Sequence, residues 1–187
     1  MSTPDFIGIY DNALSSEECD ELITFFESSK KIKGVVFDSV EKKAIVNPNS
    51  KKNVELAKAF VSTTPICMVR SLSKCVEKYV QEYESLSWIP KWNLIDRYTF
   101  QKLQYYDDGY KSWHTEHGPP PCSDRILVWM FYLNDAASGT EFMHFPTIEG
   151  KMGRCIIWPA AWTHLHKSAP NKGLKYITSG WISHTGQ

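Results

Sequence analysis

The chain has 187 residues with 21 basic and 21 acidic side chains, so its formal net charge is zero and bulk charge predicts neither a nucleic-acid nor an anionic-membrane partner. Its length suits one domain with a full core. The five cysteines are scattered without a CxxC pair, which disfavours a disulfide framework or a thiolate zinc site. The N-terminus lacks the pattern of a signal peptide and no apolar run approaches membrane-spanning length, so we expect a cytoplasmic protein with no membrane partner.

The first part of the chain combines a helix signal with a polar stretch. The pattern predicts a short strand over residues 6–10 and a capping box from Ser15 to Glu18, which begins an amphipathic helix that ends near Ser29. Residues 30–53 are rich in lysine and are broken by glycine and by Asn-Pro. We expect this stretch to be a solvated, partly mobile connection, as most charge runs are. The alternative is a flap over a substrate groove.

A second helix signal follows. Thr64 and Pro65 predict a helix start, with threonine as the N-cap and proline at the first helical position. Apolar side chains then recur at three- and four-residue steps and form one stripe, made of Val69, Leu72, Val76, Tyr79, Val80 and Tyr83. We expect both helices to pack against one face of a sheet.

From Leu94 onward the apolar spacing changes to that of strands. The predicted strands cover residues 98–105, 125–133, 140–145, 154–158 and 175–181, with a further strand around His114 after an Asp-Asp-Gly turn. Helices first and strands after predict an α+β, mainly β fold, a double-stranded β-helix (jelly-roll) with the N-terminal helices packed on one sheet. We expect one domain over residues 1–187, with a helical support region at 1–93 and a jelly-roll core at 94–184.

Two short segments carry candidate metal ligands. In an extended strand, residues two apart share a face, so His114 and Glu116 can direct an imidazole and a carboxylate to one point. A second strand carries His164 and His166, again on one face. Two histidines and one carboxylate with open positions opposite form the facial arrangement of non-haem Fe(II) oxygenases. The same ligand types also suit zinc, so a mononuclear zinc hydrolase is an alternative.

Lys175 is the candidate anion-binding residue. It lies in a predicted strand between apolar neighbours. A lysine that faces the interior without a partner loses several kcal/mol of hydration, so an inward Lys175 predicts an anion beside it. The simpler interpretation is that Lys175 faces solvent.

These residues belong to a longer series of short motifs in fixed order. They are Tyr106-Asp107-Asp108-Gly109-Tyr110, His114-x-Glu116, Tyr132-Leu133-Asn134-Asp135, Ser138-Gly139-Thr140-Glu141-Phe142, Trp158-Pro159, Thr163-His164-Leu165-His166, Gly173-Leu174-Lys175-Tyr176 and Trp181. In this order and spacing the chain resembles the prolyl 4-hydroxylase-like branch of the 2-oxoglutarate- and Fe(II)-dependent dioxygenases, in a small form like those of phages and cyanobacteria. The similarity runs from about Phe6 to Trp181 and is specific from about Gln101.

The resemblance implies a ligand set and a co-substrate site. In the family the second histidine ligand is followed by a proline four residues later and a basic residue nine or ten later, which selects His166 because Pro170 and Lys175 occupy those places. His114, Glu116 and His166 would thus bind Fe(II), with His164 in a supporting position. Lys175 would hold the distal carboxylate of 2-oxoglutarate. Most members have Asp where this chain has Glu116, whereas halogenating members lack the carboxylate, so Glu116 favours hydroxylation.

The remaining expectations concern the pocket and the substrate. The resemblance implies Tyr106, with Tyr105 as the rival, as a hydroxyl donor to the co-substrate, Thr140 and Trp181 as pocket-lining residues, and ascorbate as a reductant. The first expected substrate is a peptidyl residue, proline above all. The alternatives are a free amino acid or other small metabolite, or a metal-binding jelly-roll without turnover. The sequence does not predict the oligomeric state.

Overall fold

The structure is a computed structural model that describes residues 5–38, 40–57, 64–89, 92–95 and 97–184. The α-helices in these ranges are α1 (Ser16–Ser28) and α2 (Ile66–Glu82). Two short 3-10 helices follow later in the chain, at Glu84–Trp88 and Trp162–His164. All other regular elements described are strands, so the fold is α+β and mainly β, as the sequence predicts. None of the helices among the described residues has the length and apolar character needed to cross a membrane.

The strands fall into two groups along the chain. The first group lies before and between the helices and comprises β1 (Gly8–Tyr10), β2 (Lys31–Lys33), β3 (Val36–Asp38), β4 (Lys43–Ile45), β5 (Lys51–Lys52) and β6 (Val54–Leu56). The second follows α2 and comprises β7 (Trp92–Asn93), β8 (Tyr98–Leu103), β9 (Gly109–Tyr110), β10 (Arg125–Tyr132), β11 (Ala136–Phe142), β12 (Ile148–Gly150), β13 (Cys155–Pro159), β14 (His166–Ser168) and β15 (Lys175–His184).

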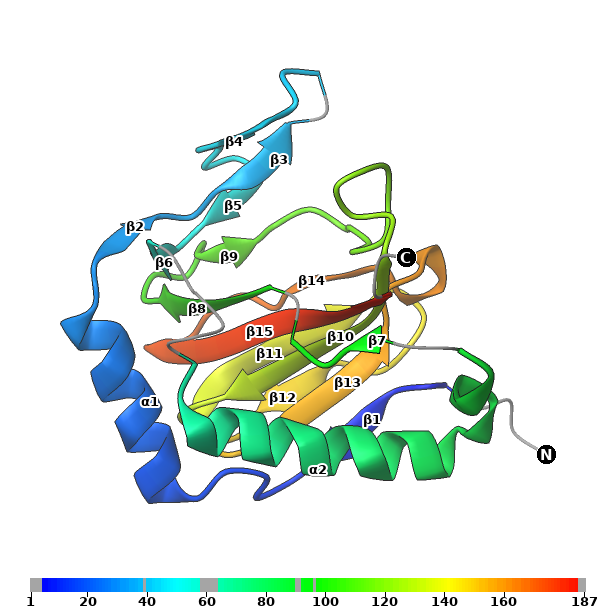
Figure 1. Ribbon diagram of the computed structural model, residues 1–187. Coiled ribbons are helices and arrows are strands. Elements are labelled where there is room, and N and C mark those ends of the chain that lie inside the picture. The colour runs from blue at the N-terminus through cyan, green and yellow to red at the C-terminus, as the bar shows by residue number, and fades with distance from the viewer. Residues whose placement is uncertain (1–4, 39, 58–63, 90–91, 96, 185–187) are drawn as a thin grey trace.

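A large antiparallel sheet forms the body of the molecule (Figure 1). Its strands follow the order β1-β13-β10-β15-β8-β6-β2, with β7 paired to β15. A smaller sheet has the order β12-β11-β14, and two further pairs are β3-β4 and β5-β9. Because β10 and β13 are central and buried on both faces, their sequences are almost continuously apolar.

Both helices pack on the same apolar cluster. Leu22 and Phe26 of α1 and Leu72 and Tyr79 of α2 share it with Trp129 of β10. A second cluster, which includes Val128, Tyr132, Phe142, Ile156 and Trp158, joins the large sheet to the smaller one. A fully buried large side chain contributes roughly 1.5–3 kcal/mol. The helices therefore stiffen one face of the large sheet, while the smaller sheet covers the other.

The helix starts show where local sequence rules hold. Ser15 caps α1, and Glu18 bonds back to the Ser15 amide, which confirms the capping box. The prediction for α2 is wrong by one residue, because Pro65 is the N-cap rather than the first helical residue and no side chain caps the helix. Proline in this extended conformation still fixes the entry of the chain into the helix.

Two predictions about the first 93 residues need correction. This region is not a helical support alone: besides the predicted strand β1, it contributes β2 and β6 to the large sheet. Residues 30–53 are not an irregular connection either: they contain β2, β3, β4 and β5, and the β3–β4 hairpin projects from the body above the sheet (Figure 1). Glu55 fixes the base of the hairpin, since its carboxylate accepts the Val35 amide at 3.3 Å and pairs with Lys51.

Candidate metal centre and its cavity

His114 and His166 are joined through their backbones. His114 lies in an irregular segment rather than in the predicted strand, and its only β-type pairing among the described residues is an isolated antiparallel bridge to His166. The His114 amide donates to the His166 carbonyl at 3.1 Å, and the His166 amide returns a bond to the His114 carbonyl at 3.0 Å. This reciprocal pair sets the imidazole centroids 4.3 Å apart.

The carbonyl of Ala160 fixes the segment that carries Glu116. It accepts the Thr115 hydroxyl at 2.6 Å, the Glu116 amide at 3.2 Å and the His117 amide at 2.8 Å. The backbone is thus held without a strand ladder. The predicted outcome, an imidazole and a carboxylate directed to one point, is confirmed, but the predicted cause, a regular strand, is wrong.

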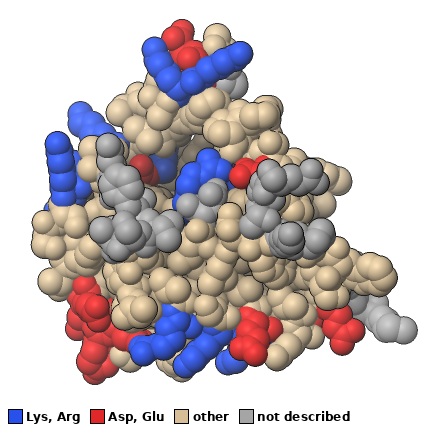
Figure 2. Space-filling model, in the orientation of Figure 1, with Lys and Arg blue, Asp and Glu red and all other residues tan. Residues whose placement is uncertain are grey.

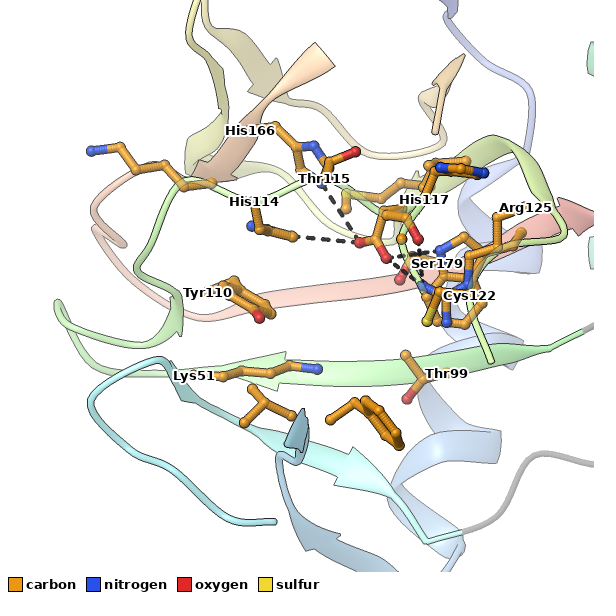
Figure 3. Close-up of a pocket in the computed structure, with 18 of the residues that line it drawn as sticks. Lys51, Thr99, Tyr110, His114, Thr115, His117, Cys122, Arg125, His166 and Ser179 are labelled. Carbon is orange, nitrogen blue, oxygen red and sulfur yellow. Dashed lines mark hydrogen bonds and ion pairs between the residues drawn. The ribbon is translucent and has the colours of Figure 1, made fainter. Parts of the chain in front are cut away.

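The three side chains converge on one point, and Figure 3 labels two of them, His114 and His166, beside each other. Oε1 of Glu116 lies 3.5 Å from Nε2 of His114 and 3.7 Å from Nε2 of His166. One ligand atom from each residue lies within 4.8 Å of those of the other two. Ions bound by histidine and carboxylate take ligands at roughly 2.0–2.2 Å, so a single cation fits between them with small side-chain movements.

Hydrogen bonds at Nδ1 orient both imidazoles for metal binding through Nε2. Nδ1 of His114 lies 3.0 Å from the Ser112 carbonyl, and Nδ1 of His166 lies 2.9 Å from the His164 carbonyl. A carbonyl accepts only from a protonated nitrogen, so both rings present the Nε2 lone pair to the site. Burial lowers the pKa of His114, which favours the neutral, ligating form. Burial raises the pKa of Glu116, but the two facing imidazoles, when they carry a proton on Nε2, outweigh it and hold that pKa well below its usual range.

His164 supports the centre differently from the prediction. Its imidazole does not share a face with His166: Nε2 bonds to the Asp5 carbonyl at 2.8 Å and the ring stacks on Phe145. The 3-10 turn at Trp162–His164 rotates the chain before β14 begins. Only the backbone carbonyl of His164 reaches His166, so the imidazole has a structural role.

A cavity of about 760 Å³ opens over the three ligands, and Figure 2 shows the hollow on this face below the projecting hairpin. One wall comes from the hairpin and its base, through Val35, Val36, Phe37, Lys42 and Lys51. His117 is exposed and lines the cavity. The hairpin is therefore part of the cavity, which favours the flap interpretation over a solvated connection.

Tyr110 links the hairpin side of the cavity to a candidate ligand. Its ring stacks on His114 with centroids 3.7 Å apart and 17° between the planes. Lys51 pairs with Tyr110 through β5 and β9, and its ammonium lies 6.0 Å from the same ring. In Figure 3, Lys51 and Tyr110 accordingly lie on the same side of His114.

Lys175 faces the interior, as expected for an anion-binding residue. It is 2 % exposed, and its ammonium donates to the Ser138 hydroxyl at 2.9 Å and to the Gly139 carbonyl at 3.4 Å. Desolvation lowers its pKa to about 8, and no carboxylate partner is found among the described residues. The next residue of β11, Thr140, lines the cavity as predicted, and its hydroxyl lies 2.7 Å from that of Tyr132.

The tyrosine prediction does not match the structure. Tyr105 and Tyr106 are 61 % and 71 % exposed, and neither lines the cavity. The reason is local: the Asp108 carboxylate accepts the Gln104 and Tyr105 amides and turns the chain outward after β8. The buried hydroxyl near Thr140 belongs to Tyr132, which sequence reasoning missed because β10 is apolar on both faces and gives no alternation that identifies its cavity side.

Trp181 and Arg125 complete the site. Trp181 lines the cavity as predicted, and its indole N–H donates to Oε2 of Glu116 at 3.0 Å. Arg125, which no sequence motif identifies, also reaches this oxygen, at 2.8 Å. An arginine at the first position of a predicted strand gives no sign that it faces inward.

No protein-family model and no curated protein matches the sequence. Solved structures match over nearly the whole chain. A collagen prolyl hydroxylase of Paramecium Bursaria Chlorella virus-1, in complex with 2-oxoglutarate, is 20 % identical with a TM-score of 0.69, covering 96 % of this chain and 97 % of the viral one. A prolyl hydroxylase of Trichoplax adhaerens, in complex with a peptide fragment of hypoxia inducible factor, is 14 % identical with a TM-score of 0.70, at 96 % and 84 % coverage.

A third similar structure is the non-haem α-ketoglutarate-dependent epimerase SnoN of nogalamycin biosynthesis, 11 % identical with a TM-score of 0.66, at 96 % and 79 % coverage. The chain therefore has the fold of the 2-oxoglutarate- and Fe(II)-dependent oxygenases and resembles their prolyl hydroxylases. This likeness agrees with the resemblance drawn from the sequence motifs.

Proposed function

We propose that the protein is an Fe(II)- and 2-oxoglutarate-dependent dioxygenase that hydroxylates a peptidyl residue, with proline as the first candidate. The observation that carries this proposal is the convergence of His114, Glu116 and His166 at the floor of a cavity. Two imidazoles and one carboxylate on one side of an ion match the facial site of non-haem iron oxygenases. With 2-oxoglutarate and dioxygen, the iron would supply the oxidising chemistry that places one atom of dioxygen in a substrate C–H bond and the other in succinate, with release of carbon dioxide.

The residues of the chain would bind and orient the reactants. Both Nε2 atoms and Oε1 of Glu116 hold the ion from one side and leave the cavity side open. The ammonium of Lys175 would neutralise the distal carboxylate of 2-oxoglutarate. The hydroxyls of Thr140 and Tyr132, which lie together, would donate hydrogen bonds to the same carboxylate. Trp158 and Trp181 give the cavity aromatic walls that exclude water. We also infer that the two larger sheets form the expected jelly-roll.

A peptide substrate is supported by the shape and lining of the cavity. At about 760 Å³ it lies in the upper part of the range for ligand pockets, roughly 300–1,000 Å³. Its outer wall is the apolar part of the hairpin, Val36 and Phe37, with Pro119 and Pro120 on another side. Two of the similar structures are named as prolyl hydroxylases, and one holds a peptide.

Succinate formation tests the reaction class. Purified protein should convert 2-oxoglutarate to succinate only when Fe(II) is added, and ascorbate, which the family resemblance predicts as reductant, should sustain turnover. Zinc in place of iron should give no succinate. Succinate release that does not need iron would contradict the proposal. So would the absence of succinate release from the iron-loaded protein with every substrate tested, which would favour a hydrolase or a binding module.

The second candidate is the same chemistry on a small metabolite. The similarity to SnoN favours it, because that protein shows that this fold also serves an epimerase of a biosynthetic pathway. A proline-containing peptide library and a panel of free amino acids should be incubated in parallel with the iron-loaded protein. Mass spectrometry that finds one added oxygen only in peptides supports the first candidate. The addition of oxygen to free amino acids alone would overturn it.

A further inference from the structure

The two oxygens of the Glu116 carboxylate have different partners. Oε1 faces the imidazoles of His114 and His166, whereas Oε2 points away from them. Oε2 accepts a bond from Nη1 of Arg125 at 2.8 Å and another from Nε1 of Trp181 at 3.0 Å. Hydrogen bonds to an ionised oxygen are the stronger class in proteins. The carboxylate is thus divided into one oxygen that is free for a cation and one that is already bound.

The donors themselves are rigid. Arg125 begins β10 and Trp181 lies in the neighbouring strand β15, so the large sheet fixes the distance between them. The guanidinium lies over the indole, with its central carbon 3.7 Å from the ring centroid. Nη1 of Arg125 also donates to the Glu116 backbone carbonyl at 3.1 Å. The arginine therefore holds the residue at both its backbone and its side chain through one nitrogen, while its planar group lies over the indole, and a lysine lacks that planar group.

Glu116 needs such a restraint. It lies in an irregular segment, and its side chain has one more rotatable bond than an aspartate. A carboxylate with this freedom binds a cation with either one or both oxygens. Binding with both would occupy a further position on the cavity side of the ion. That position is needed if 2-oxoglutarate takes two places and dioxygen a third.

We propose that Arg125 and Trp181 act as positioning residues, here called the Oε2 clamp, which limit Glu116 to coordination through Oε1 and so keep one position of the metal available for dioxygen. The inference rests on the proposed iron function and deepens it. Arg125 and Trp181 act through Glu116 in this role. The clamp also gives a physical reason why this chain can carry glutamate where aspartate is usual.

Nitric oxide, a stable stand-in for dioxygen whose adduct with iron(II) has its own EPR signal, tests the clamp without turnover. Wild type, Trp181→Phe, Arg125→Lys and the double variant are loaded anaerobically with Fe(II) and 2-oxoglutarate and titrated with nitric oxide. Trp181→Phe removes one donor but keeps a ring beside the guanidinium. We expect roughly threefold weaker nitric oxide binding in each single variant and at least about tenfold in the double variant, from the loss of one or two charged hydrogen bonds.

The visible charge-transfer band of iron-bound 2-oxoglutarate is recorded in the same samples, so that weak loading is not mistaken for a blocked position. Ile177→Val is the matched control, because Ile177 lines the same cavity from β15, where it pairs with Tyr132 and Gln101 rather than with Glu116. Circular dichroism shows which variants fold, and Trp181→Phe alone suffices if the others do not. Equal nitric oxide binding in wild type and a loaded clamp variant overturns the clamp but leaves the iron site intact. A wild type that binds no iron overturns both.

Discussion

The two ends of the proposed active site are built in opposite ways. At the metal end, each candidate ligand has its supporting bond within the chain: both Nδ1 atoms face carbonyls, and Oε2 of Glu116 accepts from Arg125 and Trp181. At the other end, Lys175 is buried, and the partners of its ammonium among the described residues, Ser138 and Gly139, are both neutral. An uncompensated buried ammonium is costly. The metal end is therefore organised by the protein alone, whereas the lysine end gains its missing counter-charge only from a ligand.

The largest effect should come from removing a metal ligand. His166→Ala should weaken Fe(II) binding by more than about 100-fold and abolish iron-dependent succinate release, because the remaining residues supply only two ligands. Calorimetric titration of the metal and a succinate assay measure this. His164→Gln is the matched control, since its imidazole bonds to the Asp5 carbonyl outside the site. Equal loss of metal binding in both variants would contradict the assignment of His166.

The lysine end should respond separately from the metal end. Lys175→Met should raise the KM for 2-oxoglutarate by roughly 100-fold while the affinity for Fe(II) stays within about twofold, because a buried charge partner is lost but no ligand is. Lys102→Met is the control, since Lys102 lies on the neighbouring strand and pairs with Glu27. A parallel loss of metal affinity in Lys175→Met would remove the distinction between the two ends.

The same substitution should stabilise the ligand-free protein. Burial lowers the pKa of Lys175 from 10.5 to about 8 in the folded state, so the unfolded state binds more protons between these values. The free energy of unfolding of the wild type should therefore rise as pH increases from about 8 to about 10.5. At pH 7 the folded state bears a cost on the order of 3 kcal/mol for the charged ammonium.

Urea unfolding of wild type and Lys175→Met at pH 7 and pH 10 measures this cost. The variant should be more stable at pH 7, and the difference should shrink at pH 10. When 2-oxoglutarate is added to the Fe(II)-loaded proteins, it should stabilise the wild type further but not the variant. A variant that is less stable than wild type at both pH values would show that Lys175 already has its compensation within the chain.

A smaller effect is expected at Tyr132. Tyr132→Phe removes the hydroxyl that lies 2.7 Å from that of Thr140 and keeps the buried ring. The KM for 2-oxoglutarate should rise about fivefold, as expected for one neutral hydrogen bond of about 1 kcal/mol. Tyr106→Phe should leave this constant unchanged, because Tyr106 is exposed. The reverse result would restore the original tyrosine prediction.

The smallest effect is expected outside both ends, on the hairpin. Phe37 lines the cavity and is 46 % exposed, so Phe37→Ala should raise the KM for a peptide substrate about threefold through lost apolar contact. Succinate release without peptide should not change, since no metal or 2-oxoglutarate contact is altered. Equal effects on both rates would place the hairpin in the co-substrate site instead.

Sequence reasoning succeeded where a local rule decides the structure. The capping box of α1, the apolar run of β10 and the inward turn of Lys175 each follow from residues within one element. It failed where a distant group decides. The Ala160 carbonyl, far along the chain, shapes the segment of Glu116. The tyrosine prediction failed for a local reason, because the Asp108 carboxylate accepts the Tyr105 amide and turns Tyr106 outward.

The clamp and the hairpin illustrate the same limit. Arg125 faces inward because it donates to the Glu116 carboxylate and lies over the Trp181 ring. No spacing in the sequence indicates these contacts. The stretch that contains the hairpin was expected to be solvated because of its lysines, yet Lys51 has a buried partner in Glu55. Pairing across the fold, rather than composition, decides both cases.

The β3–β4 hairpin forms a two-stranded sheet of its own. Among the described strands it shares no ladder with the body, and it is attached through neighbouring strands that pair with β6, β8 and β9. Mutations in the hairpin therefore leave the hydrogen-bonded framework of the oxygenase fold intact. Evolution, or a protein engineer, can therefore exchange the hairpin to change which molecules are recognised, while the sheets that hold the metal ligands stay the same.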